Sequence, residues 1–101
     1  MTEFEFAADP DRVIHEPARL KLMAVLSVAE SADFTYLMGE TGLTRGNLSV
    51  QLTRLSDAGY IEIAKEFVGR SPRTTASMTR KGRAAFDEYR TYLAGLLKAT
   101  S

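Results

Sequence analysis

The stretch from Leu43 to Tyr60, LTRGNLSVQLTRLSDAGY, constrains the fold more than any other part of the chain. Three leucines in it recur at a helical spacing, which places them on one face of a helix. They are Leu48, Leu52 and Leu55. Thr44 is a suitable N-cap before them, and Gly59 follows where a left-handed residue commonly ends a helix. We therefore predict a helix over residues 44–58 with a buried leucine face.

The opposite face of this helix is nearly uncharged but rich in hydrogen-bonding groups. It carries Asn47, Val50, Thr53, Arg54 and Asp57, with Ser49 and Gln51 on its flanks. A strip of this kind suits the reading of base edges in the major groove of DNA. An ordinary solvent-exposed face has a similar composition, so the rest of the chain has to decide between the two interpretations.

Length and composition narrow the class of molecule. With 101 residues, 45% of them hydrophobic and 26% charged, the chain has the size and composition of one globular domain. It contains no cysteine, which excludes disulfides and thiolate sites, and we expect neither a metal nor a cofactor. No apolar run approaches the ~18 residues of a membrane span, and the acidic N-terminus does not resemble a secretion signal. We therefore expect a cytoplasmic protein without a membrane partner.

The formal net charge is zero, but the charges are segregated along the chain. Residues 1–44 hold eight acidic and three basic side chains, whereas residues 45–83 hold eight basic and three acidic ones. A molecule polarised in this way can present a positive face to DNA despite its neutral total. Acidic and basic halves also arise by chance, so the asymmetry supports DNA binding without establishing it.

The chain divides into an N-terminal arm at residues 1–10 and one domain at residues 11–101. For the arm, an edge strand, packing on a partner subunit and disorder all remain open. The pattern from Asp11 to about Ala29 is helical with a break, and Pro17 is best accommodated in the first turn of a helix. A second helix capped by Thr35 extends to Thr41. Only two residues then precede the helix at Thr44, which is the layout of a helix-turn-helix.

A β-hairpin follows. Alternating apolar and acidic side chains from residue 60 predict one strand, and small and β-branched residues at 74–78 predict another. Between them lies a tip with the sequence Gly69-Arg70-Ser71-Pro72-Arg73. Hairpin tips are commonly polar, but two arginines beside a helix-turn-helix favour contact with phosphates or the minor groove. We place this wing at residues 68–74.

A last helix, capped by Thr79, is predicted over residues 79–98. Its apolar residues form a stripe of nearly 3.5-residue period, which needs more partner surface than the small body supplies. We therefore predict dimerisation through this helix, with packing inside the monomer as the alternative. The expected interface residues are Phe86, Tyr89, Leu93, Leu96 and Leu97. Gly82 lies in the first turn, where fraying makes a glycine less costly.

Three separated segments carry a family resemblance: IHEPARLKLMAVL (14–26), DFTYLMGETGLTRGNLSVQLTRLSDAGYIEI (33–63) and MTRKGRAAF (78–86). Together they are similar to the single-domain winged-helix transcriptional regulators of the MarR/ArsR type. The resemblance implies an α+β, mostly helical fold, with a two- to three-stranded antiparallel wing and a C-terminal dimerisation helix. It also implies a homodimer on double-stranded DNA, with the helix at 44–58 in the major groove and the wing on the backbone or minor groove.

Carried across residue by residue, the resemblance assigns DNA contacts to the start and outer face of this helix and to the wing. Asn47 or Gln51 suits a bidentate pair with adenine, and Val50 can touch a thymine methyl. Arg45 or Arg54 can pair with guanine or hold a phosphate. The full set is Thr44, Arg45, Asn47, Ser49, Val50, Gln51, Arg54, Lys65, Arg70 and Arg73. At Val50 the chain departs from the family pattern, in which many relatives carry a polar or basic residue.

The leading function is thus a dimeric, sequence-specific DNA-binding transcriptional regulator. The alternative is a winged helix that binds proteins instead of DNA, since a fold does not fix a function. We do not expect an enzyme, because the sequence has one histidine, His15, and shows no catalytic triad, phosphate-binding loop or carboxylate pair. A small-molecule effector would need a cleft between subunits, and nothing in the sequence indicates one.

Overall fold

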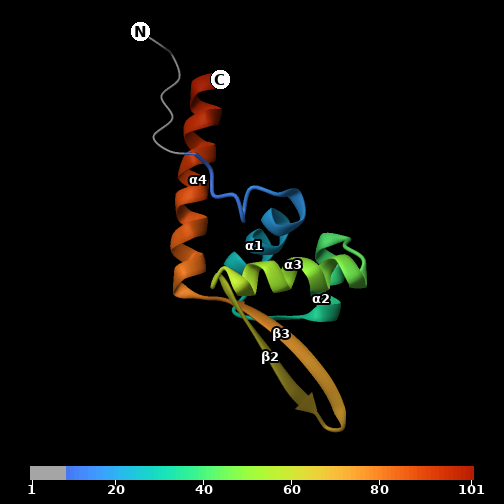
Figure 1. The fold of residues 1–101 in the computed structure, drawn as a ribbon. Helices are drawn as coiled ribbons and strands as arrows, with labels where there is room; N and C mark the ends of the chain where they lie inside the picture. Colours follow the sequence, from blue (N-terminus) through green and yellow to red (C-terminus); the bar gives the residue numbers. More distant parts are fainter. Residues whose placement is uncertain (1–8) are drawn as a thin grey trace.

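The computed structural model describes residues 9–101, so the predicted N-terminal arm lies almost entirely outside the described residues. Within this range, four helices and three strands follow one another (Figure 1). They are α1 (Pro17–Val28), β1 (Ala32–Asp33), α2 (Phe34–Thr41), α3 (Arg45–Asp57), β2 (Ile61–Val68), β3 (Ser71–Met78) and α4 (Arg80–Thr100).

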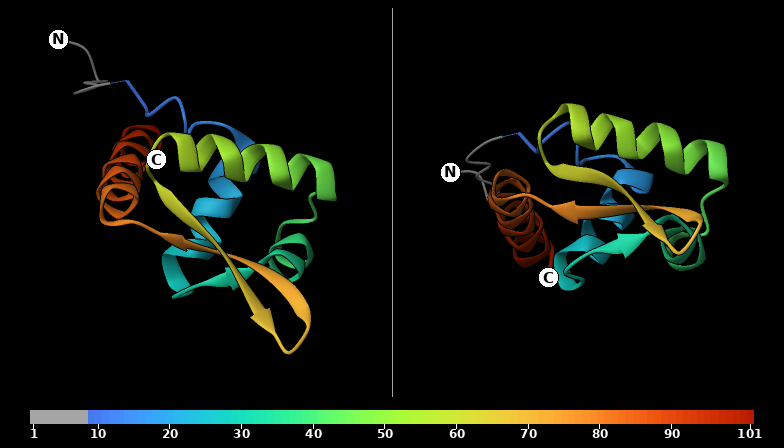
Figure 2. Two further views of the ribbon diagram at one scale, coloured as in Figure 1. Left: turned by 60° about the horizontal axis from the view of Figure 1, so that its bottom comes forward. Right: turned by 90° about the horizontal axis from the view of Figure 1, so that it is seen from below.

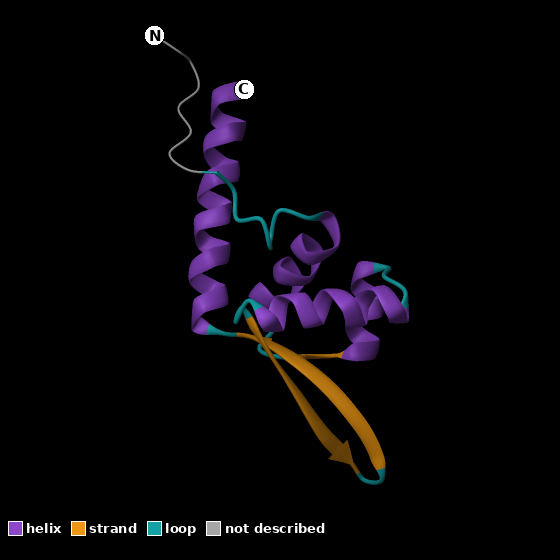
Figure 3. Ribbon diagram, in the orientation of Figure 1, coloured by secondary structure: helices purple, strands orange, loops and turns teal. Residues whose placement is uncertain are grey.

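The strands form one antiparallel sheet in the order β1-β3-β2. β1 is short, and pairs Ala32 with Ala76 and Asp33 with Thr75. β2 and β3 pair along their whole length and project from the helices as a hairpin (Figure 1, Figure 3). Helix-turn-helix and hairpin together form a winged helix, which confirms the predicted fold class.

The first helix begins at Pro17, which the sequence places in the first turn of a helix. A missing N–H costs nothing there because first-turn N–H groups have no helical partner. The Glu16 carboxylate caps the helix by accepting the backbone N–H groups of Ala18 and Arg19, both at 3.0 Å. Burial alone would raise the pKa of Glu16, but these two bonds and the Arg19 charge hold it below its usual value.

The helix-turn-helix is defined by two further caps. α2 is capped by Asp33 and not by the predicted Thr35, since Asp33 Oδ1 accepts the Tyr36 N–H at 2.7 Å. Thr44 caps α3 as predicted, with its hydroxyl accepting the Asn47 N–H at 3.2 Å. The N-termini of both helices of the motif are therefore held by short polar side chains that stand just outside the helices.

A single core joins the helices to the base of the sheet. α3 lies across α1, and its three predicted leucines are all buried (Figure 2). The largest fully buried side chains are Ile14, Leu22, Met23, Leu26, Leu37, Leu48 and Leu55. The leucine face of α3 is thus what fixes its rotation about its own axis.

The first half of α4 completes this core. Phe86 and Tyr89 are only 6% and 4% exposed, so these two residues, predicted at a dimer interface, instead pack inside the single chain. A hydrogen bond of 2.8 Å joins the Tyr89 hydroxyl to Nδ1 of His15. Towards the C-terminus, Leu93 and Leu96 are half-buried and Leu97 is 68% exposed.

The start of α4 lies unusually close to the turn that joins α3 to β2. Thr79 donates its hydroxyl to the Gly59 carbonyl at 2.6 Å and accepts the Gly82 N–H at 3.0 Å. A Cβ on Gly82 would lie 2.1 Å from the Tyr60 carbonyl oxygen. Gly82 is therefore required by this close approach, and helix fraying is not the reason for it.

Candidate nucleic-acid interface

The outer face of α3 is exposed as the leucine pattern predicts. Because the leucines fill the core, the helix turns its other side to solvent. The exposed side chains on it include Asn47, Ser49, Val50, Thr53 and Arg54. Arg54 is the one cation of this list, so the strip is mostly a set of neutral hydrogen-bonding groups.

Two amide side chains of this helix are linked to each other and to α1. Gln51 Nε2 donates to Asn47 Oδ1 at 3.0 Å, and Gln51 Oε1 accepts from Arg19 Nη1 at 2.7 Å. Gln51 is consequently half-buried. Arg19 was not among the predicted site residues, because it lies 32 positions from Gln51 and no local periodicity connects them.

The start of α3 is exposed and partly committed to local bonds. The Thr44 hydroxyl is used by the cap, and the Arg45 guanidinium carbon lies 5.4 Å from the centre of the Phe34 ring, as in a cation–π contact. Gly46 faces open space, because a Cβ there would meet no atom within 4 Å. A partner can therefore approach the backbone closely at this point.

The wing is tighter than predicted, and its arginines differ. β2 and β3 are joined by Gly69 and Arg70 alone, so Arg73 belongs to β3. Arg73 Nη2 lies 3.0 Å from Asp33 Oδ2, whereas Lys65 and Arg70 are exposed and form no ion pair within residues 9–101. The pKa of the Asp33 carboxyl is lowered most by the hydrogen bond from the Tyr36 N–H and next by the one from Arg73.

The wing also exposes apolar side chains that were not predicted as site residues. Phe67 is 74% exposed, and Ile63 and Val68 are exposed on the same strand. Phe67 stands opposite Pro72 in the register of the hairpin. The alternating pattern of β2 predicts a strand but cannot show that the strand continues beyond the body of the molecule.

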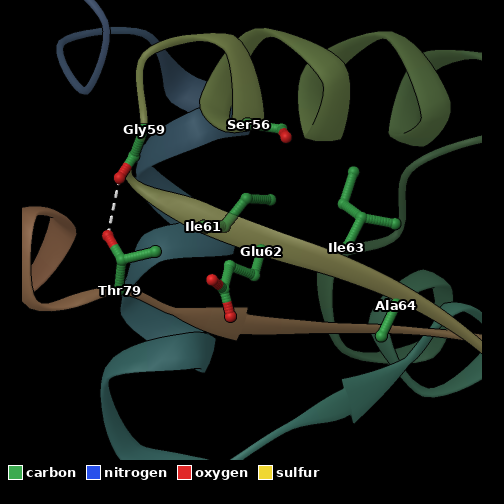
Figure 4. A pocket seen from close by; sticks show the side chains of 7 residues that line it. All are labelled: Ser56, Gly59, Ile61, Glu62, Ile63, Ala64 and Thr79. Carbon is green, nitrogen blue, oxygen red and sulfur yellow. Dashed lines mark hydrogen bonds between the residues drawn. The ribbon is translucent and has the colours of Figure 1, made fainter.

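A hollow of about 560 Å³ lies where α3 passes into β2 (Figure 4). Its lining residues are Ser56, Gly59, Ile61, Glu62, Ile63, Ala64 and Thr79. Glu62 is the one acidic group in this lining. No group of three or more potential metal ligands occurs among residues 9–101, nor any helix suited to crossing a membrane.

Comparisons with known proteins agree with this geometry. A family model described as a winged helix DNA-binding domain matches residues 18–97. Uncharacterized protein MJ0432 of Methanocaldococcus jannaschii is 33% identical over 78 residues, which are 77% of this chain and 85% of that protein. The structure of the transcriptional regulator homologue protein from Pyrococcus horikoshii OT3 is similar with a TM-score of 0.83 at 25% identity, and 88% of each chain is covered.

A second solved structure has the same fold at lower identity. It is described as a transcriptional regulator of the MarR family from Enterococcus faecalis V583. The TM-score is 0.72 at 23% identity, with 81% of this chain and 74% of that chain covered.

Proposed function

The chain belongs to the winged-helix DNA-binding domain family, and from this premise we propose that it acts as a homodimeric, sequence-specific regulator of transcription. Its predicted likeness to regulators of the MarR/ArsR type is confirmed. In the proposal, α3 enters the major groove and the β2–β3 hairpin lies on the adjacent backbone or minor groove. The observation that carries it is the outer face of α3, which is held from behind by buried leucines and lined in front by hydrogen-bonding groups.

The candidate residues divide by chemistry. Asn47, Val50 and Arg54 stand on the outer face and read base edges, with Gln51 acting through Asn47. The remaining contacts are to phosphates and come from Thr44, Arg45, Ser49, Lys65 and Arg70. Arg73 contributes less than Arg70, because Asp33 already neutralises much of its charge.

Two subunits associate through the C-terminal part of α4. Leu93, Leu96 and Leu97 supply the apolar surface, since Phe86 and Tyr89 are used by the core of each chain. A Leu97→Glu substitution removes the most exposed of these leucines and leaves the core intact. We expect sedimentation to show a dimer for the natural chain and a monomer for this variant, with helical content unchanged.

Selection of bound duplexes from a random pool tests the proposal. We expect two related half-sites with two-fold symmetry, spaced by about one helical turn of DNA or a multiple of it. Failure to enrich any duplex at low salt would contradict DNA recognition. A single half-site without symmetry would contradict the homodimer but not the reading of DNA by α3.

The salt dependence of binding tests the wing. If Arg45, Lys65 and Arg70 each contact one phosphate per subunit, a dimer releases about six counterions, and log affinity falls against log salt with a slope near −5. Arg70→Ala should reduce that slope by about 2, on specific and random duplexes alike. The matched control is Lys98→Ala at the far end of α4, which should leave the slope unchanged. An unchanged slope for Arg70→Ala would contradict phosphate contact by the wing.

A second candidate function is supported by the apolar wing. Ile63 and Phe67 are both exposed and lie on the same face of β2, as in a surface that binds another protein. This function takes precedence if no duplex is enriched and if a soluble partner binds the natural chain but not a Phe67→Ser variant.

A further inference from the structure

Arg19 lies on α1, away from the outer face of α3, yet it is bonded to that face through Gln51. We propose that Arg19 is a positioning residue that sets the base preference of α3 by fixing the orientation of two amide side chains. These are Gln51 and Asn47, which is bonded to Gln51. The inference rests on the proposed DNA-binding function.

The guanidinium of Arg19 is held in place by the segment that leads into its own helix. Its side chain is only 14% exposed, and its Nε donates to the Val13 carbonyl. Nη1 lies 3.6 Å from the Glu16 carboxylate, and Glu16 is itself fixed as the cap of α1. A guanidinium has five N–H donors and no acceptor, so Arg19 always presents a donor to Gln51.

This donor determines how the Gln51 amide is turned. An amide has an oxygen that accepts and a nitrogen that donates, and a half-turn exchanges the two. Only one of the two orientations places Oε1 against Arg19, since the other would bring two donors together. Nε2 then points to Asn47, and the Asn47 oxygen must turn towards it to accept the bond of 3.0 Å.

As a result, the Nδ2 donors of Asn47 point away from Gln51 and towards the exposed outer face of α3. A donor in the major groove matches acceptors, of which guanine presents two, N7 and O6, whereas adenine presents N7 and thymine O4 alone. Cytosine at the same position presents the N4 donor and is mismatched. The linked amides therefore favour guanine on the strand that Asn47 faces, in place of the bidentate adenine pair expected from the sequence.

Substitution of Arg19 removes the constraint without touching the DNA face. In Arg19→Met an unbranched apolar stem is kept and the guanidinium donors are lost, so the Gln51 amide can adopt both orientations. We expect the preference for guanine over cytosine at one position of each half-site to fall about tenfold, because the Asn47 donors are then no longer held outward. Arg19→Lys, which restores a donor, should recover part of the preference.

A matched control separates this effect from charge. Arg12 is an exposed arginine just before α1, and Arg12→Met removes the same charge without touching the amide pair. Both Met variants should bind random DNA with equal affinity, but only Arg19→Met should change the selected sequence. Gln51→Ala should produce the same loss, and combining it with Arg19→Met should add nothing further.

Gln51→Glu is expected to reverse the base preference. A carboxylate accepts from Arg19 and can only accept from Asn47, so the Asn47 amide has to reverse and turn its oxygen outward. The preferred base should then change from guanine to one that donates, cytosine or adenine. This variant keeps the bond to Arg19, so it tests the inference even where Arg19→Met does not fold.

The experiment is duplex selection with the natural chain and these variants, with the melting temperature of each protein measured in parallel. The inference is overturned if Gln51→Glu selects the same base as the natural chain. It is also overturned if a folded Arg19→Met keeps its base preference, or loses affinity equally for all duplexes. If the natural chain itself enriches no duplex, the proposed function fails and not the positioning role alone.

Discussion

α3 and the wing are proposed to touch the same duplex, but they are built in different ways. α3 is anchored along its length by three buried leucines, whereas β2 buries only Ile61 at its base. Beyond that residue the wing is held by the pairing of β2 with β3, by the short pairing of β3 with β1 at the buried Ala76, and by one partly exposed ion pair, Arg73 with Asp33. The core thus fixes the direction of α3, and weaker surface contacts fix the direction of the wing.

The largest expected difference comes from removing one large apolar side chain in each region. Leu55→Ala leaves a cavity in a fully buried site and should lower the free energy of unfolding by about 2–5 kcal/mol. Phe67→Ala removes an even larger side chain, but from solvent, and should change it by only about 0.5 kcal/mol or less. Urea denaturation at one protein concentration measures both. Equal costs would mean that Phe67 is packed against a partner in solution.

The same contrast separates what the sequence could predict from what it could not. The spacing of the α3 leucines and the caps Thr44 and Thr79 depend on residues within one or two turns, and these predictions were confirmed. The ion pair of Arg73 with Asp33 joins residues 40 positions apart, and no local pattern connects them. Such contacts appear only once the fold brings distant elements together.

Periodicity also cannot identify what an apolar stripe faces. Phe86 and Tyr89 share the α4 stripe with the exposed Leu97, yet the first two pack into the chain's own core. Gly82 shows the same limit, since only the distance to the Tyr60 carbonyl reveals why a side chain is excluded there. Of the proposed DNA contacts, the face of α3 was predictable, but the orientation of its amides by Arg19 was not.

A smaller effect is expected at the contact that fixes the wing. Asp33→Asn keeps a good cap for α2 but removes the charge paired with Arg73, so it isolates the ion pair. Because both groups are partly exposed, the loss of unfolding free energy should be below about 1 kcal/mol at neutral pH. DNA affinity should rise, since Arg73 is then free to bind a phosphate.

The pH dependence of this effect has a definite sign. The pKa of Asp33 is lowered in the folded chain, first by the Tyr36 N–H and then by Arg73. Its contribution to stability is therefore present above the unfolded pKa of an aspartate and is lost as the pH falls through the folded pKa. Urea denaturation of Asp33→Asn and the natural chain should differ at neutral pH and converge in acid. Glu30→Gln, an exposed acid on the loop before β1, is the control and should show no such difference.

The smallest expected effect on folding lies at the start of α3, where stability and binding should change in opposite directions. Gly46→Ala meets no protein atom and favours the helix, so it should raise the free energy of unfolding by about 0.5 kcal/mol. If the DNA backbone approaches α3 at this point, the added methyl group should lower affinity for specific and random duplexes. Gly39→Ala in α2 also meets open space and serves as the control, with a similar gain in stability and unchanged affinity. Equal DNA affinity for both variants would show that the start of α3 stays away from the duplex, and the docking of α3 would then have to be revised.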